Sequence, residues 1–224
     1  MKYMIHTCNR RRWYVNKILI PDMLEQGIKK EDITVAVDTH GEGTLIATMK
    51  MFDYIGRTQD WNDIVWHLQD DVLISSNFKA KTEELYGDII CGFCSRYDTT
   101  KKWGSVLKDE IWYSFPCIGI NNFIAKECAR WFFEKAVYDD LQKDIILTHK
   151  HDDLMFQRFI NIYDKPIKCF NVKPNLVEHI DYLIGGSLVN PNRTDKKVTS
   201  YYWVENKKVE QLQAKIEYMY VSHN

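Results

Sequence analysis

Two pairs of adjacent aspartates carry the clearest chemical signal in the sequence, Asp70–Asp71 and Asp152–Asp153. Asp70–Asp71 follows the mostly apolar stretch 64–68, which places it at the end of a predicted strand. Adjacent carboxylates repel each other unless a cation lies beside them, and oxygen ligands of this kind suit Mg²⁺ or Mn²⁺ held jointly with substrate phosphates. The alternative is a polar turn in which an aspartate caps the next helix.

The second pair, Asp152–Asp153, precedes an apolar run and opens a predicted helix. Aspartate is favoured there by capping and by the helix dipole, which is the structural interpretation. The functional interpretation makes one of the two a general base that takes the proton of an attacking hydroxyl. Both hold together if one aspartate caps while the other faces a pocket. His179 becomes a candidate metal ligand only if the fold returns it to Asp71.

The elements around these residues alternate between strand and helix in the first half of the chain. This alternation predicts an α/β fold whose parallel sheet is covered on both faces and binds ligands beyond the carboxyl ends of its strands. Three strand ends carry polar groups, at 7–10, Asp38 and 70–71, and we expect them to converge. The predicted strands are 4–7, 33–37, 63–68 and 89–94, and the predicted helices are 12–25 (kinked or divided at Pro21), 44–54 and 75–86 (capped by Ser75 or Ser76).

The second half of the sequence is less regular. Residues 96–110 have the composition of a mobile loop, and residues 190–197 form a polar linker. The remaining predicted elements are strand-like segments at 111–120 and 167–172, helices at 122–137 and from 152, and a terminal helix at 207–220.

The composition excludes several classes of protein. The chain has 224 residues, 45% of them hydrophobic and 13% aromatic, which argues against disorder. Thirty basic residues against 31 acidic ones give a net charge of −1, which excludes a uniformly basic nucleic-acid binder but leaves room for a local basic face. The sequence contains no run of about 20 apolar residues, and Arg10–Arg12 comes too early for a signal peptide. We therefore expect a cytoplasmic protein without a membrane partner.

The six cysteines are expected to be reduced, because a chain this long needs no disulfide framework. Cys91 and Cys94 form the only close pair. On the predicted strand they point to opposite faces, which argues against a shared zinc ion.

Four segments, in their order along the chain, resemble motifs of glycosyltransferases with the GT-A fold. The resemblance covers roughly residues 3–190. Residues 68–72 resemble the acidic metal motif, 116–121 the acceptor-side strand and loop, 151–153 the acidic pair whose second member is the base of inverting enzymes, and 174–180 the late segment whose histidine completes metal binding. One departure is that Gln69 replaces the first acid, which leaves Asp71 as the surer metal ligand.

The resemblance implies a Rossmann-type, mostly parallel sheet flanked by helices, with a less regular acceptor-side half. It divides the chain into a catalytic domain, 1–195, and an extension with a helix, 196–224. Within the domain, 1–95 would bind the nucleotide sugar and 96–195 would face the acceptor. The implied activity is metal-dependent transfer of a sugar from a nucleotide-sugar donor, a UDP-sugar first, to a hydroxyl group with inversion.

The resemblance also implies a role for each candidate residue. Asp153 would be the base and Asp152 would orient the acceptor, while Asp71 and His179 would hold Mn²⁺ or Mg²⁺. Asp70 would contact the donor sugar or support the ligands. The groups implied in nucleotide and diphosphate binding are Thr7, Asn9, Arg10 and Asp38, together with Lys101 and Lys102 on the mobile loop.

The acceptor is open between several chemistries. The chain is rich in Lys, Ile, Asn, Asp and Tyr and is similar to phage-encoded transferases that glycosylate or arabinosylate hydroxymethylated cytosine in double-stranded DNA, which would place it in the host cytoplasm. Basic clusters at 10–12, 101–102 and 196–197 could contact DNA phosphates or could be ordinary solvated charge. A surface polysaccharide or lipopolysaccharide is the alternative acceptor.

Two alternatives from other classes remain. A metal-dependent phosphohydrolase could use His151–Asp152 as an HD-type pair. Phosphohydrolases of this type have an all-helical fold, and the predicted strands that end at Asp38 and Asp70 argue against it. A non-catalytic module that binds a nucleotide or a sugar would use Asp153 only as a cap.

Overall fold

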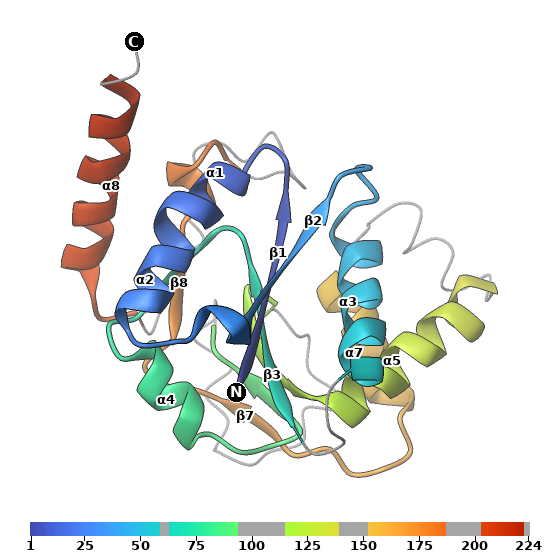
Figure 1. Cartoon of the computed structure of the whole chain (residues 1–224). Helices are drawn as coiled ribbons and strands as arrows, with labels where there is room; N and C mark the ends of the chain where they lie inside the picture. Colours follow the sequence, from blue (N-terminus) through green and yellow to red (C-terminus); the bar gives the residue numbers. More distant parts are fainter. Residues whose placement is uncertain (59–62, 94–114, 139–151, 187–202, 222–224) are drawn as a thin grey trace.

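The computed structural model describes residues 1–58, 63–93, 115–138, 152–186 and 203–221 (Figure 1). Its main sheet has six strands in the spatial order β2-β1-β3-β6-β5-β7. β6 is antiparallel to both of its neighbours, and the other pairings are parallel. The prediction of an α/β fold with a mostly parallel sheet is confirmed. The strands are β1 (Lys2–Cys8), β2 (Ile33–Asp38), β3 (Ile64–Gln69), β5 (Ile89–Cys91), β6 (Cys117–Asn121) and β7 (Cys169–Asn171).

A second, two-stranded sheet follows directly from the end of β3. It pairs β4 (Val72–Ile74) antiparallel with β8 (Val177–His179). This small sheet returns a segment from more than a hundred residues later in the sequence to the end of β3, and the 3-10 turn η5 (Asp181–Leu183) follows it.

Three helices cover one face of the main sheet: α3 (Thr44–Thr58), α5 (Asn122–Glu134) and α7 (Asp152–Ile162) (Figure 1). In α3 the buried side chains recur at helical spacing, as at Leu45, Met49 and Phe52. Asn121 caps α5 by accepting a hydrogen bond from the Phe123 backbone. The short 3-10 helix η3 (Ala136–Tyr138) follows α5.

The opposite face is covered by the helical segment 12–25 and by α4 (Phe78–Glu84) (Figure 1). The segment consists of α1 (Arg12–Tyr14), the π-helical turn η1 (Val15–Leu19) and α2 (Ile20–Glu25), and the 3-10 turn η2 (Lys30–Asp32) precedes β2. The backbone stays helical through Leu19 and Ile20, and the change from π-helix to α-helix comes just before Pro21, which lies in the first turn of α2.

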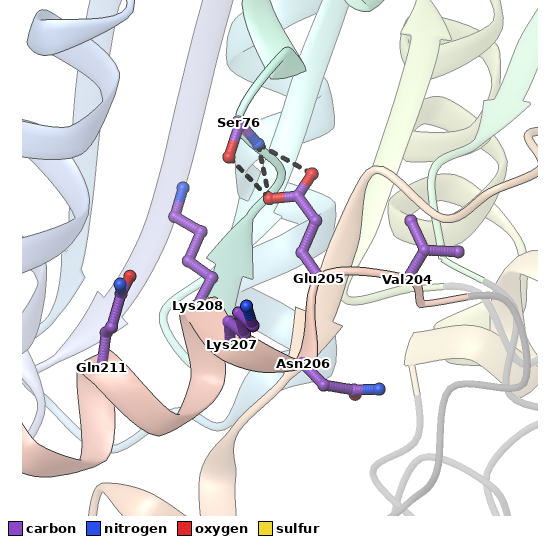
Figure 2. Close-up of a pocket in the computed structure, with 7 residues that line it drawn as sticks. All are labelled: Ser76, Val204, Glu205, Asn206, Lys207, Lys208 and Gln211. Atoms are coloured by element: carbon purple, nitrogen blue, oxygen red, sulfur yellow. Dashed lines mark hydrogen bonds between the residues drawn. The ribbon is translucent and has the colours of Figure 1, made fainter.

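The C-terminal helix α8 (Asn206–Val221) packs on this second face through Val209, Leu212 and Ile216. Polar contacts of Glu205 and Lys208 fix its start, among them a salt bridge from Lys208 to Asp22 at 2.9 Å. The Glu205 carboxylate accepts hydrogen bonds from the backbone N–H and the hydroxyl of Ser76, beside a cavity of about 510 Å³ (Figure 2). The Lys208 ammonium donates to the Ile74 carbonyl at 2.8 Å. The predicted extension helix is therefore docked beside β4 of the small sheet, and its proposed boundary at 195 falls outside the described residues.

Several element boundaries differ from the prediction for local reasons. Helix α4 begins at Phe78, with Asn77 at the capping position in place of Ser75 or Ser76. The Ser75 hydroxyl instead donates to Asn77 Oδ1 at 3.3 Å, and Asn77 makes no side-chain capping bond. Strand β5 ends at Cys91.

Some predicted features lie outside the described residues. They are Cys94, the loop 96–110 with Lys101 and Lys102, and the basic pair 196–197. Within the described ranges, none of the helices is both long enough and apolar enough to cross a membrane.

Candidate active site

The carboxyl ends of β1, β2 and β3 meet at one edge of the sheet. Cys8 of β1 is paired with Asp38 of β2, and His6 of β1 is paired with Gln69 of β3. The polar strand ends therefore converge as the sequence predicts, because neighbouring parallel strands in register end at the same edge.

Asp70 ties the end of β3 to the end of β1. Its carboxylate accepts hydrogen bonds from the Thr7 hydroxyl at 2.8 Å and from the Cys8 backbone N–H at 3.2 Å. Arg11 Nη1 donates to its second oxygen at 3.0 Å. Burial and the charge of Asp71 raise the pKa of Asp70, and Arg11 and Thr7 only partly offset this.

Asp71 is buried between the Arg11 guanidinium and the His179 imidazole. Its Oδ2 lies 2.6 Å from Arg11 Nη1 and 3.3 Å from His179 Nε2. Burial would raise the pKa of Asp71, but His179 and Arg11 outweigh it and hold the pKa well below its usual range. The other oxygen, Oδ1, is buried and has no hydrogen-bond partner among the described residues.

The small sheet brings His179 to this position. Val72 is paired with His179 across β4 and β8, and the Ile180 backbone N–H donates to the Asp71 carbonyl at 2.8 Å. His179 Nδ1 lies 3.6 Å from Asp181 Oδ1 on its other side. Burial alone would lower the pKa of His179, but the nearby charge of Asp71, with Asp181, raises it. The fold thus brings His179 next to Asp71, which is the condition for His179 to be a candidate metal ligand.

The Asp71–His179 pair is compatible with a shared divalent ion. Two ligand atoms bonded to one Mg²⁺ at about 2.1 Å and at right angles lie about 3.0 Å apart, close to the Nε2–Oδ2 separation. Asp71 Oδ1 is buried, has no hydrogen-bond partner among the described residues, and is a further ligand atom for the ion. Within the described ranges no group of three or more His, Cys, Asp or Glu side chains could hold a metal by itself. An ion here would therefore need phosphate oxygens or water as additional ligands.

Arg11 is the site residue that the sequence did not single out. It is 3% exposed and donates to Asp70, Asp71 and the Gly186 carbonyl. Its predicted neighbours lie at the surface: Asn9 is exposed, and Arg10 is exposed and donates to the Gly185 carbonyl at 2.9 Å. The signal that could have found Arg11 is the buried acidic pair itself, which requires a nearby cation.

Asp152 is enclosed by neutral hydrogen-bond donors. Its Oδ2 accepts from Gln69 Nε2 at 3.1 Å and from the Thr48 hydroxyl at 3.2 Å, and its Oδ1 accepts from the Asp153 backbone N–H. Burial, with the charge of Asp153 second, raises the pKa of Asp152 to about 7. Asp153 is only partly buried, and its carboxylate accepts from the Leu154 backbone N–H at 2.8 Å.

Gln69 connects the two acidic pairs. Its backbone precedes Asp70–Asp71, and its side chain reaches Asp152. The sequence marks Gln69 only as a departure from the acidic motif, whereas the structure gives it a contact that another carboxylate could not make to Asp152 without repulsion.

Asp38 shapes the loop after β2. Its carboxylate accepts from the backbone N–H groups of His40, Glu42 and Gly43. Burial would raise the pKa of Asp38, but these bonds outweigh it and lower the pKa. Asp38 and His6 also line a cavity of about 390 Å³ between β1, β2 and α3.

His67 is a buried histidine surrounded by core side chains. It is fully buried, neither ring nitrogen has a hydrogen-bond partner among the described residues, and burial lowers its pKa to about 3. Its ring packs edge-on against Phe52 and Phe115, so it serves as a neutral aromatic core residue.

Comparison with known proteins gives likenesses only at the level of structure. No protein-family model matches the sequence, and no curated protein matches it. The structure is similar to the galactosyltransferase LgtC in complex with donor and acceptor sugar analogues, with a TM-score of 0.46, 12% identity and 96% of each chain covered. It is also similar to residues 1–349 of S. aureus TarS, with a TM-score of 0.43, 10% identity, and 82% of this chain and 62% of that chain covered.

A TarS structure in complex with UDP gives a TM-score of 0.37 at 11% identity, covering 78% of this chain and 61% of that chain. At this distance the functional proposal rests on the site geometry.

Proposed function

We propose that the chain is a glycosyltransferase with a GT-A-type fold that transfers a sugar from a nucleoside diphosphate sugar to a hydroxyl group, with a divalent ion as cofactor. One observation carries the proposal. The end of β3 places Asp71 beside His179 and, through Gln69, holds the acidic pair at the start of α7. A charged site for a diphosphate and a carboxylate for an acceptor hydroxyl are thereby joined at one sheet edge.

The donor nucleotide would bind across the ends of β1 and β2. Thr7 and Asn9 lie at the end of β1, and Asp38 borders a cavity whose volume suits a nucleoside. Arg10 is exposed beside this edge and can contact a phosphate. UDP-sugars are the first donors to test, as the sequence resemblance implies.

The charge of the diphosphate would be met by Arg11 and by the ion at Asp71 and His179. When bound, the ion stabilises the negative charge that develops on the departing nucleoside diphosphate. Asp70 keeps Arg11 and the end of β1 in place through its contacts with Thr7 and Cys8. Asp181 flanks His179 and favours its orientation toward Asp71.

Asp153 would be the general base. It takes the proton of the acceptor hydroxyl while the oxygen attacks the anomeric carbon, and the bond to the diphosphate oxygen breaks on the opposite side, which inverts the configuration. Asp153 suits this role because it is less buried than Asp152. Asp152 would orient the acceptor side by fixing the start of α7 to Gln69 and Thr48.

The first acceptor we propose is the hydroxymethyl group of modified cytosine in double-stranded DNA. The sequence resemblance supports it, as do Arg10 and Arg12, which are exposed beside the site. Incubation with a labelled UDP-sugar and DNA containing hydroxymethylcytosine should label that DNA and leave unmodified DNA unlabelled. Labelling of lipopolysaccharide or polysaccharide instead would move the acceptor to the bacterial surface.

A thermal-shift series with nucleoside diphosphates and UDP-sugars tests the donor site. Ligands that bind the native state raise the Tm by mass action, so UDP with Mn²⁺ should raise it more than either alone. Absence of any shift with all nucleotides would contradict the proposal. Binding without donor hydrolysis or transfer to any acceptor would favour a non-catalytic nucleotide-binding module.

A further inference from the structure

Arg11 is bonded to the Asp71 carboxylate oxygen that the proposed divalent ion would also use. Its Nη1 lies 2.6 Å from Asp71 Oδ2, the same oxygen that lies 3.3 Å from His179 Nε2. A guanidinium and a dication on one carboxylate oxygen repel each other strongly in a buried site. The two cations therefore cannot both use this oxygen in the arrangement seen here.

The structure also provides a place for Arg11 after it leaves Asp71. Nη1 is already 3.0 Å from Asp70 Oδ1, and Nη2 donates to the Gly186 carbonyl. Breaking the bond to Asp71 would thus leave Arg11 paired and buried. The two adjacent aspartates differ accordingly: Asp70 is bound by Thr7, Cys8 and Arg11, whereas Asp71 keeps a free buried oxygen, Oδ1, among the described residues.

We infer that Arg11 is a resident counter-ion that competes with the divalent ion for Asp71 and is released toward the diphosphate of the donor when the ion binds. This inference rests on the proposed function and adds a mechanism of regulation to it. Without nucleotide, the ion has to displace Arg11 from Asp71 and remain close to a buried guanidinium that is still held by Asp70 and the Gly186 carbonyl. With a nucleoside diphosphate bound, the phosphate oxygens pair with Arg11 and supply ligands to the ion.

Two consequences follow for binding. Mn²⁺ alone binds weakly, and a nucleoside diphosphate strengthens the binding of Mn²⁺. By thermodynamic linkage, Mn²⁺ must strengthen the binding of the nucleoside diphosphate by the same factor. Removing the guanidinium removes the competitor, so Mn²⁺ alone then binds more tightly while the nucleoside diphosphate loses a partner. The free protein thereby keeps Asp71 neutralised until the donor arrives.

The test is the binding of Mn²⁺ to the full chain, measured by electron paramagnetic resonance of the free ion, with and without UDP at fixed pH. Arg11→Met removes the charge and keeps most of the side-chain length. Arg12→Met is the matched control, since it removes the same charge from the adjacent, exposed position. We expect Arg11→Met to lower the Kd for Mn²⁺ alone by about tenfold or more and to shrink the effect of UDP, whereas Arg12→Met changes either by less than about twofold.

A second measurement uses the parent protein and protects the test against misfolding of Arg11→Met. In ¹⁵N-labelled protein the Arg11 side-chain Nε signal, assigned by its loss in Arg11→Lys, should move when Mg²⁺ and UDP are added together. It should move less with Mg²⁺ alone. An unchanged Arg11 signal in the presence of both would overturn the inference.

The outcomes separate this inference from the proposed function. Equal Mn²⁺ affinity in the parent and in Arg11→Met would overturn the inference and leave a metal-dependent transferase intact. No Mn²⁺ binding in any variant, with or without UDP, would overturn both the inference and the metal dependence. Tighter Mn²⁺ binding in Arg11→Met, in a protein that transfers no sugar to any acceptor, would support the inference and overturn the transferase proposal.

Discussion

The two Asp–Asp pairs have the same sequence and opposite surroundings. Asp70–Asp71 meets the Arg11 guanidinium and the His179 imidazole, and the pKa of Asp71 falls well below its usual range. Asp152 meets the neutral donors Gln69 and Thr48, and burial raises its pKa to about 7. The residue type thus does not fix the chemistry of a carboxyl group, because partners from distant parts of the chain decide whether it stays charged.

This difference assigns complementary tasks to the two pairs. A carboxylate that stays charged over the whole neutral range suits a cation and a diphosphate. A carboxyl that titrates near neutrality, beside a more exposed aspartate, suits the proton-transfer side of the reaction. The predictions below alter one pair at a time.

The largest effect is expected for Asp153→Asn. The amide keeps the shape and much of the capping ability but cannot take a proton, so kcat should fall on the order of 10²–10⁴-fold with little change in donor affinity. Steady-state kinetics with a saturating donor measures this. Turnover like that of the parent on a true acceptor would leave Asp153 as a helix cap and require another base or a retaining mechanism.

Asp71→Asn should act on the other pair alone. Loss of the negative charge should weaken Mn²⁺-dependent UDP binding by on the order of 100-fold, while UDP binding without metal should not weaken, because Arg11 is freed for the diphosphate. Calorimetric titration with and without EDTA makes the comparison. Asp152→Asn serves as the control, because it alters a buried carboxyl in the second pair and should leave metal dependence unchanged.

The pH dependence of stability should single out Asp152. Its pKa is raised in the folded state, so the folded protein binds more protons than the unfolded chain between about pH 4 and 7. The stability contributed by the protonated form is complete below pH 4 and is lost as the pH rises toward 7. The free energy of unfolding of Asp152→Asn, taken relative to that of the parent, should therefore be higher at pH 8 than at pH 5 by on the order of 2–4 kcal/mol. Urea titrations of both proteins at pH 5 and pH 8 measure this change. A stability difference between variant and parent that is the same at both pH values would contradict the raised pKa.

Thr48→Val is the smallest change. It removes one neutral donor to Asp152 while keeping the side-chain shape. The expected cost is about 1 kcal/mol at pH 8 and less at pH 5, because the hydrogen bond favours the charged carboxylate. A cost that is equal at both pH values would indicate a packing effect unrelated to Asp152.

The sequence predicted the features that depend on local pattern. Apolar strands that end in polar residues were sufficient to place Thr7, Asp38 and Asp70–Asp71 at one edge of the sheet. Helical periodicity located α3, α5 and α7 with their starts at the predicted residues, whereas α3 ends later than predicted and α5 ends earlier. These features follow from burial and backbone pairing, which leave a periodic signal in the residues themselves.

Other parts of the site depend on contacts between distant segments and carry no such signal. Arg11 and its two neighbours are identical in type, and only the tertiary fold buries Arg11 against Asp70 and Asp71. The bond from Gln69 to Asp152 joins residues that are 83 positions apart. His179 could be named as a candidate from the sequence, but its position depends on the register of β4 with β8.

The central claim is that the edge formed by Asp71, His179 and the start of α7 activates a nucleotide sugar with the help of a divalent ion. The most direct measurement is the release of UDP from UDP-sugars by the parent protein and by Asp71→Asn, with Mn²⁺ or with EDTA. Because water can replace the acceptor, this assay needs no knowledge of the true acceptor. We predict release by the parent with Mn²⁺ and little release with EDTA or from Asp71→Asn. Equal release in all four conditions, or binding of UDP-sugars at a site indifferent to Asp71, would contradict the account.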